Sequence, residues 1–195
     1  MSIKINYSNK FTSKFTTNLV LFVDQNFNID GLKKIISKNE FSYISDLLKS
    51  SDLKKDLLFF EINSKKKIFL VSIKKDIKNY DVENLGAKFH SYIDYDKKND
   101  YFINSDTVNS KIKNFVGYFL HGLKLKSYQF NIYKSKKEKR LISINVFGYK
   151  NKISAQNQLR FKALEEGSFF ARDLVSEPGN ILHPDEYAKR INTLK

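Results

Sequence analysis

Short runs of β-branched and aromatic residues alternate with helical repeats across the first 150 residues, and this alternation most constrains the fold. Six runs have the length and composition of strands. They lie at residues 3–7, 18–23, 57–62, 68–73, 101–103 and 141–147. Strands that alternate with helices predict an α/β fold, in which a mixed sheet with some parallel strands is covered by helices.

Apolar residues spaced three and four apart predict the helices between these strands. Asp106 or Thr107 is available as the N-cap of the third helix. Gly122, near the end of that helix, permits close helix packing or a tight exit. The helical repeats cover residues 32–36 with a continuation at 41–48, then 82–93 and 108–123.

A longer helix is predicted over residues 154–175, because this stretch holds no proline and places apolar residues near one face. Pro178 and the turn-forming residues after it end that helix. The residues of the apolar face are Phe161, Leu164, Ala171 and Val175.

Pro184 is favoured at a first helical position and predicts a final helix, with Asp185 and Glu186 in its first turn. Its apolar stripe has no later segment to cover it, so the sequence looks interrupted at Lys195. An uncovered stripe predicts aggregation or self-association. The stripe consists of Tyr187, Ile191 and Leu194.

Composition limits the class of protein. A hydrophobic fraction of 41% and an aromatic fraction of 14% indicate a packed globular chain. The absence of cysteine excludes disulfides and thiolate metal sites and fits a reducing cytoplasm. No apolar run approaches the ~20 residues that span a bilayer. We therefore expect a cytoplasmic protein without a membrane partner.

The net charge of +14 raises the question of nucleic-acid binding. Only four of the 35 basic residues are arginine, the better residue for bidentate phosphate contacts, so dispersed solvated lysines are the favoured interpretation. The densest basic cluster, residues 134–140, lies between two apolar segments and is expected to form a connecting loop. This cluster is the first place to test for nucleic-acid contact.

The titratable residues do not form a recognisable catalytic or metal motif. His90, His121 and His183 are isolated, and His121 near an apolar helix face is expected to have a hydrogen-bonded packing role. A solvated turn is expected for Asp94, Asp96 and Asp100, which lack the glycine and glutamate of a calcium loop. Arg172 and Asp173 are expected to form a helix-surface or interdomain pair.

Two segments carry a resemblance to a known family. In residues 114–135 a helix is followed by Gly122-Leu123 and then by Tyr128, Phe130, Tyr133 and Lys134. In residues 161–186 the order is Ala171-Arg-Asp-Leu-Val, then Glu177-Pro178, Asn180 and Pro184. Both segments resemble the leucyl aminopeptidase (cytosol aminopeptidase) family, although the family usually has Asn where Ser176 stands.

The resemblance implies an N-terminal α/β domain similar to macro domains at residues 1–150, a linker helix at 151–175, and the beginning of a catalytic domain at 176–195. In this family the catalytic domain holds two divalent metal ions, manganese or zinc, that activate water for attack on a peptide. The complete enzyme is expected to release N-terminal residues from peptides and to form a homohexamer. The family's metal and catalytic motifs are absent here, so we assign no catalytic, cofactor or metal residue and expect no metal on these residues.

Two alternatives remain open at this point. The first is a separate basic α/β module that contacts nucleic acid. The second is nucleotide or ADP-ribose binding by analogy with the macro-domain fold, for which no glycine-rich phosphate loop is present.

Overall fold

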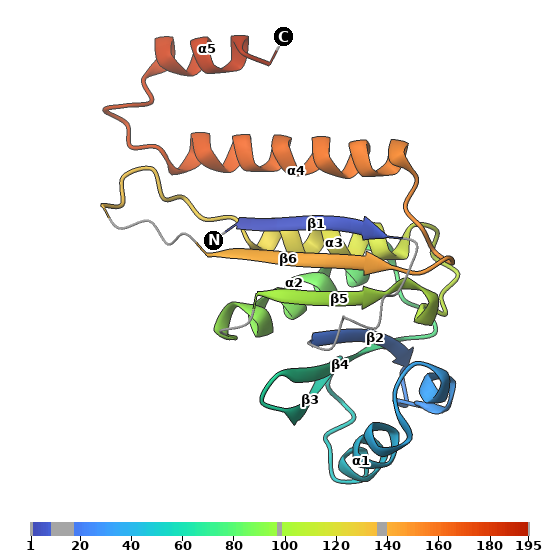
Figure 1. Cartoon of the computed structure of the whole chain (residues 1–195). Coiled ribbons are helices and arrows are strands. Elements are labelled where there is room, and N and C mark those ends of the chain that lie inside the picture. The colour runs from blue at the N-terminus through green and yellow to red at the C-terminus, as the bar shows by residue number, and fades with distance from the viewer. Residues whose placement is uncertain (1, 9–17, 97–98, 136–139, 195) are drawn as a thin grey trace.

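The computed structural model describes residues 2–8, 18–96, 99–135 and 140–194. Its centre is a six-stranded sheet with the order β1-β6-β5-β2-β4-β3 (Figure 1). Only β3 runs antiparallel to its neighbour, β4; the other adjacent pairs are parallel. The strands are β1 (Ser2–Ser8), β2 (Asn18–Asp24), β3 (Leu57–Asn63), β4 (Lys66–Ile73), β5 (Asp100–Asn104) and β6 (Leu141–Phe147).

The mixed α/β sheet predicted from the sequence is confirmed, and each of the six predicted strands is present. β2 is buried on both faces from Asn18 to Val23, as expected for a central strand of a covered parallel sheet. The helices are η1 (Asp30–Lys34), α1 (Lys38–Lys49), α2 (Asn79–Tyr95), η2 (Ser105–Thr107), α3 (Phe115–Lys126), α4 (Ala155–Ser176) and α5 (Pro184–Asn192).

Two hydrophobic clusters lie on opposite faces of the sheet. α2 and α3 cover one face, where the Phe22 ring meets Phe115 and Phe119 edge-on at 5.4 and 5.3 Å. η1 and α1 cover the other face around β2, β4 and β3, with Ile44 of α1 fully buried. Edge-to-face aromatic pairs add about 0.5–1.5 kcal/mol each to the stability that area burial supplies.

The start of the third predicted helix is wrong. α3 begins at Phe115 and not near Val108, because the side chains expected to cap it bond elsewhere. Asp106 Oδ1 accepts the backbone N–H groups of Tyr149 and Lys150 at 2.8 and 2.5 Å. The Thr107 hydroxyl accepts from Phe22 N and donates to Asn104 O.

α4 runs outside α3 at the β1 end of the sheet, and α5 lies beyond α4 (Figure 1). Ser154 caps α4 by accepting from Asn157 N, and Pro184 stands in the first turn of α5, as predicted. The apolar residues of α4 are not buried: none of its residues is buried, and Val175 is 87% exposed. Among the described helices, none combines the length and hydropathy needed to cross a bilayer.

Candidate functional site

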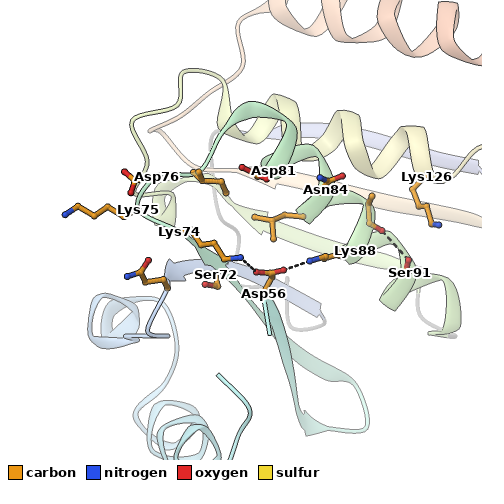
Figure 2. Close-up of a pocket in the computed structure, with 14 residues that line it drawn as sticks. Asp56, Ser72, Lys74, Lys75, Asp76, Asp81, Asn84, Lys88, Ser91 and Lys126 are labelled. Atoms are coloured by element: carbon orange, nitrogen blue, oxygen red, sulfur yellow. Dashed lines mark hydrogen bonds and ion pairs between the residues drawn. The ribbon is translucent and has the colours of Figure 1, made fainter. Parts of the chain in front are cut away.

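A pocket with a volume of about 690 Å³ lies between the α2 surface and the ends of β3 and β4 (Figure 2). Asp56, just before β3, is at its centre. Lys74 Nζ donates to Asp56 Oδ1 at 2.9 Å, and Lys88 of α2 donates to Oδ2 of the same carboxylate (Figure 2). The β3–β4 pairing brings Asp56 close to Lys74, which follows β4, and α2 supplies Lys88.

Asp56, Lys74 and Lys88 form an ion cluster within the chain. Burial acts to raise the pKa of Asp56, but the hydrogen bonds from Lys88 and Lys74 outweigh it and hold that pKa below the usual value. The hydrogen bond and charge of Asp56 raise the pKa of Lys74. A lysine held in its ammonium form is neither a nucleophile nor a general base. Lys74 therefore offers this pocket neither a nucleophile nor a general base.

A second pocket of about 660 Å³ lies at the carboxyl ends of β2 and β4, beside η2. Ligands of open α/β sheets bind at such edges, so this pocket is the place to examine for the nucleotide alternative. Its carboxylates accept hydrogen bonds from loop backbone. Asp24 Oδ1 accepts from Asn26 N and Asn28 N at 3.0 Å, and Asp106 Oδ1 accepts from Tyr149 N in the loop after β6. Lys74, Lys75 and Lys111 also line this pocket, and nucleotide binding stays an untested prediction.

The histidines are separate in space as well as in sequence. His121 of α3 is buried, and its Nδ1 lies 2.8 Å from Glu83 Oε1 of α2, which confirms the predicted hydrogen-bonded packing role. His90 of α2 is buried, and burial lowers its pKa. His183 is the N-cap residue of α5, where its side chain makes no capping hydrogen bond.

The expected solvated aspartate turn is wrong for Asp96. Its side chain is only 10% exposed and its Oδ2 lies 3.3 Å from Lys67 Nζ. Arg140 also binds this segment: its guanidinium donates to the carbonyls of Ile93, Asp94 and Asp96 at the C-terminus of α2. A cation at this position donates hydrogen bonds to carbonyl oxygens that have no partner within the helix, and it interacts favourably with the negative end of the helix dipole.

This use of Arg140 bears on the proposed basic patch at residues 134–140. The guanidinium faces the protein, so Arg140 is not available as the phosphate contact that the sequence suggested. Residues 136–139, which include Lys136, Lys137 and Lys139, lie outside the described residues. Nucleic-acid contact through these lysines stays a prediction.

Contacts from α3 and the loop after it hold α4 in place. The Tyr128 hydroxyl donates to Asp173 Oδ1 at 2.8 Å, and the Tyr133 hydroxyl donates to Glu177 Oε2. We call these four residues the tyrosine clamp. Glu177 also accepts from Arg190 of α5 at 2.8 Å, so the clamp fixes both C-terminal helices.

The clamp changes one expectation from the sequence. Arg172 and Asp173 were expected to pair with each other, but Asp173 accepts from Tyr128, and Arg172 donates to Leu125 O at 2.6 Å.

The C-terminal segment, from α4 to the residues after α5, leaves many apolar side chains exposed, including the stripe predicted for the last helix. These are Leu159, Leu164, Val175, Ile181, Tyr187, Ile191 and Leu194.

The residues that the structure describes do not fit a metal centre. Among them, no three His, Asp or Glu side chains gather closely enough to hold an ion. The most buried carboxylates are bound to cations of the chain itself, as Asp56 is to two lysines and Asp96 to Lys67.

No protein-family model matches this sequence. Curated relatives do. The sequence is 39% identical over 82 residues to the probable cytosol aminopeptidase of Methylorubrum extorquens, and 33% identical over 106 residues to that of Clostridium perfringens. Over the aligned segments the chain is similar to these cytosol aminopeptidases. The alignments include 40% and 50% of this chain but only 16% and 21% of the relatives.

The fold agrees with this relationship over nearly the whole chain. A mutant of tomato leucine aminopeptidase superposes with a TM-score of 0.75 and covers 99% of this chain at 15% identity. The match covers 42% of the tomato protein. A cytosol aminopeptidase from Coxiella burnetii superposes with a TM-score of 0.63 and 13% identity, over 96% of this chain and 37% of its own. The resemblance stated from the sequence is thereby confirmed.

The side-chain clusters that the fold assembles have no signature in the sequence. Asp56, Lys74 and Lys88 carry no motif, and neither does the Glu83–His121 pair, since each contact joins different elements. The sequence does contain a weaker signal for the tyrosine clamp. Tyr128 and Tyr133 belong to the segment that carries the family resemblance, and they form the clamp.

Proposed function

We propose that this chain is the N-terminal part of a two-metal leucyl aminopeptidase and that this part does not itself hydrolyse peptides. The relationship to curated cytosol aminopeptidases carries the proposal. The fold match to tomato leucine aminopeptidase supports it, because it extends over 99% of the chain and therefore includes the C-terminal helices.

Within this proposal, residues 1–150 form the N-terminal domain, residues 151–175 the linker helix, and residues 176–195 the beginning of the catalytic domain. The tyrosine clamp supports such a role for α4, since it fixes the direction in which the chain leaves the sheet. The exposed apolar side chains of α4 and α5 are the surface that the catalytic domain would cover.

The two metals and the water-activating chemistry belong to the catalytic domain in this account. One similar solved structure is the bottromycin maturation enzyme BotP in complex with Mn, which supports metal use among proteins of this fold. The residues described here do not provide such a site, so no catalytic step is assigned to them. We further propose a cytoplasmic homohexamer that acts on peptides, with this domain supporting assembly and restricting access.

The test compares hydrolysis of a leucyl p-nitroanilide by the purified 195-residue chain and by the native gene product, each with added Mn²⁺. We expect release of p-nitroaniline by the native product alone, and loss of that activity with a chelator. Chelator-sensitive hydrolysis by the purified chain would show that this domain is catalytic and would overturn the assignment of its role. Absence of activity in both samples would contradict the aminopeptidase proposal.

A further inference from the structure

One edge of the sheet lies far from the surface assigned to the catalytic domain. β3 ends the strand order opposite β1, and Figure 1 places it at the far end of the molecule from α4 and α5. Among the described residues, no strand pairs with its outer side. A sheet edge presents backbone donors and acceptors that can bind another strand.

The register of the β3–β4 pair identifies which backbone groups face outward. Ser72 N donates to Asp56 O at 2.9 Å, so the Asp56–Ser72 pair is hydrogen-bonded. Bonded and non-bonded pairs alternate in an antiparallel ladder. Phe59, paired with Phe69, and Glu61, paired with Lys67, are therefore non-bonded positions. Their N–H and C=O groups point away from β4, and both residues are exposed.

An aromatic groove of about 520 Å³ follows this edge between β3 and α2. The Phe59 ring lies 5.6 Å from the Tyr92 ring and 5.8 Å from the Phe69 ring, so these three form an apolar floor. Tyr95 lines the same groove and is 91% exposed. An extended peptide bound to a sheet edge places alternate side chains in pockets of this kind.

The lysines at the two ends of β3 indicate the charge of a partner that would bind this edge. Lys54 and Lys55 precede β3, Lys65 follows it, and all three are exposed. Among the described ion pairs none includes these lysines, whereas Asp56 and Glu61 are already paired with Lys88 and Lys67. The two ends of the open edge are thus positive and complement acidic groups.

The same charges disfavour one way of pairing with a second copy of the chain. This is the antiparallel register that matches Phe59 of one copy with Glu61 of the other. The same register brings Lys55 of one copy opposite Lys65 of its partner, where like charges repel.

We propose that the open edge of β3, with the groove formed by Phe59, Tyr92 and Tyr95, binds an extended acidic peptide segment of another protein. The segment adds a short antiparallel or parallel strand to β3 and places an apolar side chain in the groove, against the aromatic rings. Acidic residues at its ends pair with Lys54, Lys55 and Lys65. This inference concerns a different surface from the proposed aminopeptidase role and does not depend on it.

The experiment measures fluorescence anisotropy of labelled peptides with the purified chain. The main probe is an acidic peptide of about nine residues in which Val and Phe alternate with Thr between Glu and Asp ends. The second probe has the same side chains but N-methyl groups on alternate amides, which blocks strand pairing. The third carries Lys in place of the acidic residues. We expect binding of the first peptide, weakened by salt, and at least about tenfold weaker binding of the other two.

Matched variants locate the site. Glu61→Pro removes an outward N–H and obstructs the edge, so we expect at least about tenfold weaker binding of the acidic peptide. Glu61→Ala removes the same carboxylate but keeps the N–H, and should bind within about threefold of the unchanged chain. Tyr95→Ala should also weaken binding, whereas Tyr149→Ala, at an exposed tyrosine after β6, should not.

Several results would overturn the proposal. These are equal binding of the normal and N-methylated peptides, unchanged binding by both Glu61→Pro and Tyr95→Ala, or no binding of the acidic peptide. A dimer in sedimentation that Glu61→Pro disrupts would identify a second copy as the occupant instead. None of these results would alter the leucyl-amide test of the proposed function.

Discussion

At the residue scale, two glycines determine how closely α2 and α3 approach each other. A Cβ on Gly86 would stand 1.8 Å from Phe119 O, and a Cβ on Gly122 would stand 1.9 Å from Glu83 O. In both cases the obstacle is backbone, which cannot rotate away as a side chain can. The close approach also brings Glu83 within reach of His121, so the glycines position the buried Glu83–His121 contact.

Alanine substitution tests this packing. Gly86→Ala and Gly122→Ala should each lower the free energy of unfolding by about 3 kcal/mol or more, because the helices must separate. Gly167→Ala in α4 is the matched control, since a Cβ there meets no atom within 4 Å. We expect it to stabilise the chain by roughly 0.5–1 kcal/mol. Urea unfolding followed by circular dichroism measures all three, and equal effects at the three sites would contradict the account.

His90 gives the fold a predictable dependence on pH. Burial lowers its pKa, and its Nε2 has no hydrogen-bond partner among the described residues. The unfolded chain, with a histidine pKa of about 6.5, therefore binds a proton that the folded chain disfavours. The free energy of unfolding is therefore highest above the histidine pKa of the unfolded chain, and it falls as the pH decreases below that value.

The measurement is the melting temperature at pH of about 7.5 and about 5.5, a range above the ordinary pKa of carboxylates. We expect the native sequence to melt at a lower temperature at the acidic pH. His90→Gln should reduce this difference, because its side chain does not titrate. A pH dependence that is identical in both proteins would show that His90 is not responsible.

Some residue roles were predictable and others were not. The packing role of Gly122 follows from its position in an apolar helix, and the structure bears it out. The roles of Asp106, Arg140 and Asp173 did not follow, because each binds a group about 40 residues or more away in the sequence. A local pattern indicates a cap or a charged surface but carries no information about such partners.

At the element scale, α4 differs from the other long helices. α2 and α3 each bury apolar residues against the sheet, whereas α4 has none that is buried. It is held by Phe161 against Tyr118 and His121, by the Lys124–Glu165 ion pair, and by the tyrosine clamp. A helix held by few apolar contacts opens at a lower free energy than the core.

Hydrogen exchange tests this difference directly. In the purified chain we expect the amides of residues 155–176 to exchange faster than those of α2 and α3. The double substitution Tyr128→Phe and Tyr133→Phe removes both clamp hydroxyls and should speed exchange in α4 by several-fold. Tyr149→Phe is the control, since Tyr149 is exposed and lies outside the clamp. Unchanged exchange in α4 would mean that the clamp does not hold it.

The elements themselves were largely predictable. All six strands follow from runs of β-branched and aromatic residues, and the longer helices follow from apolar residues three and four apart. The start of α3 and the exposure of α4 did not follow. Periodicity identifies a surface able to be buried, and the apolar face of α4 has no described element over most of it.

At the scale of the whole molecule, the sheet has two ends with different surroundings. The β1 end carries α4 and α5 with their exposed apolar side chains, and the β3 end carries the open edge and the aromatic groove. Sequence resemblance indicated the family and the α/β order. It did not indicate the strand order or the β3 edge, because strand pairing is set by contacts between distant segments.

The central claim is that this chain is one domain of a larger aminopeptidase, and the intact mass of the native gene product tests it most directly. The chain has a mass of 22.9 kDa and matches 42% of tomato leucine aminopeptidase. The account predicts a native polypeptide more than twice as heavy as the chain. A native product of 22.9 kDa would contradict the account and leave the α/β domain to act by binding alone.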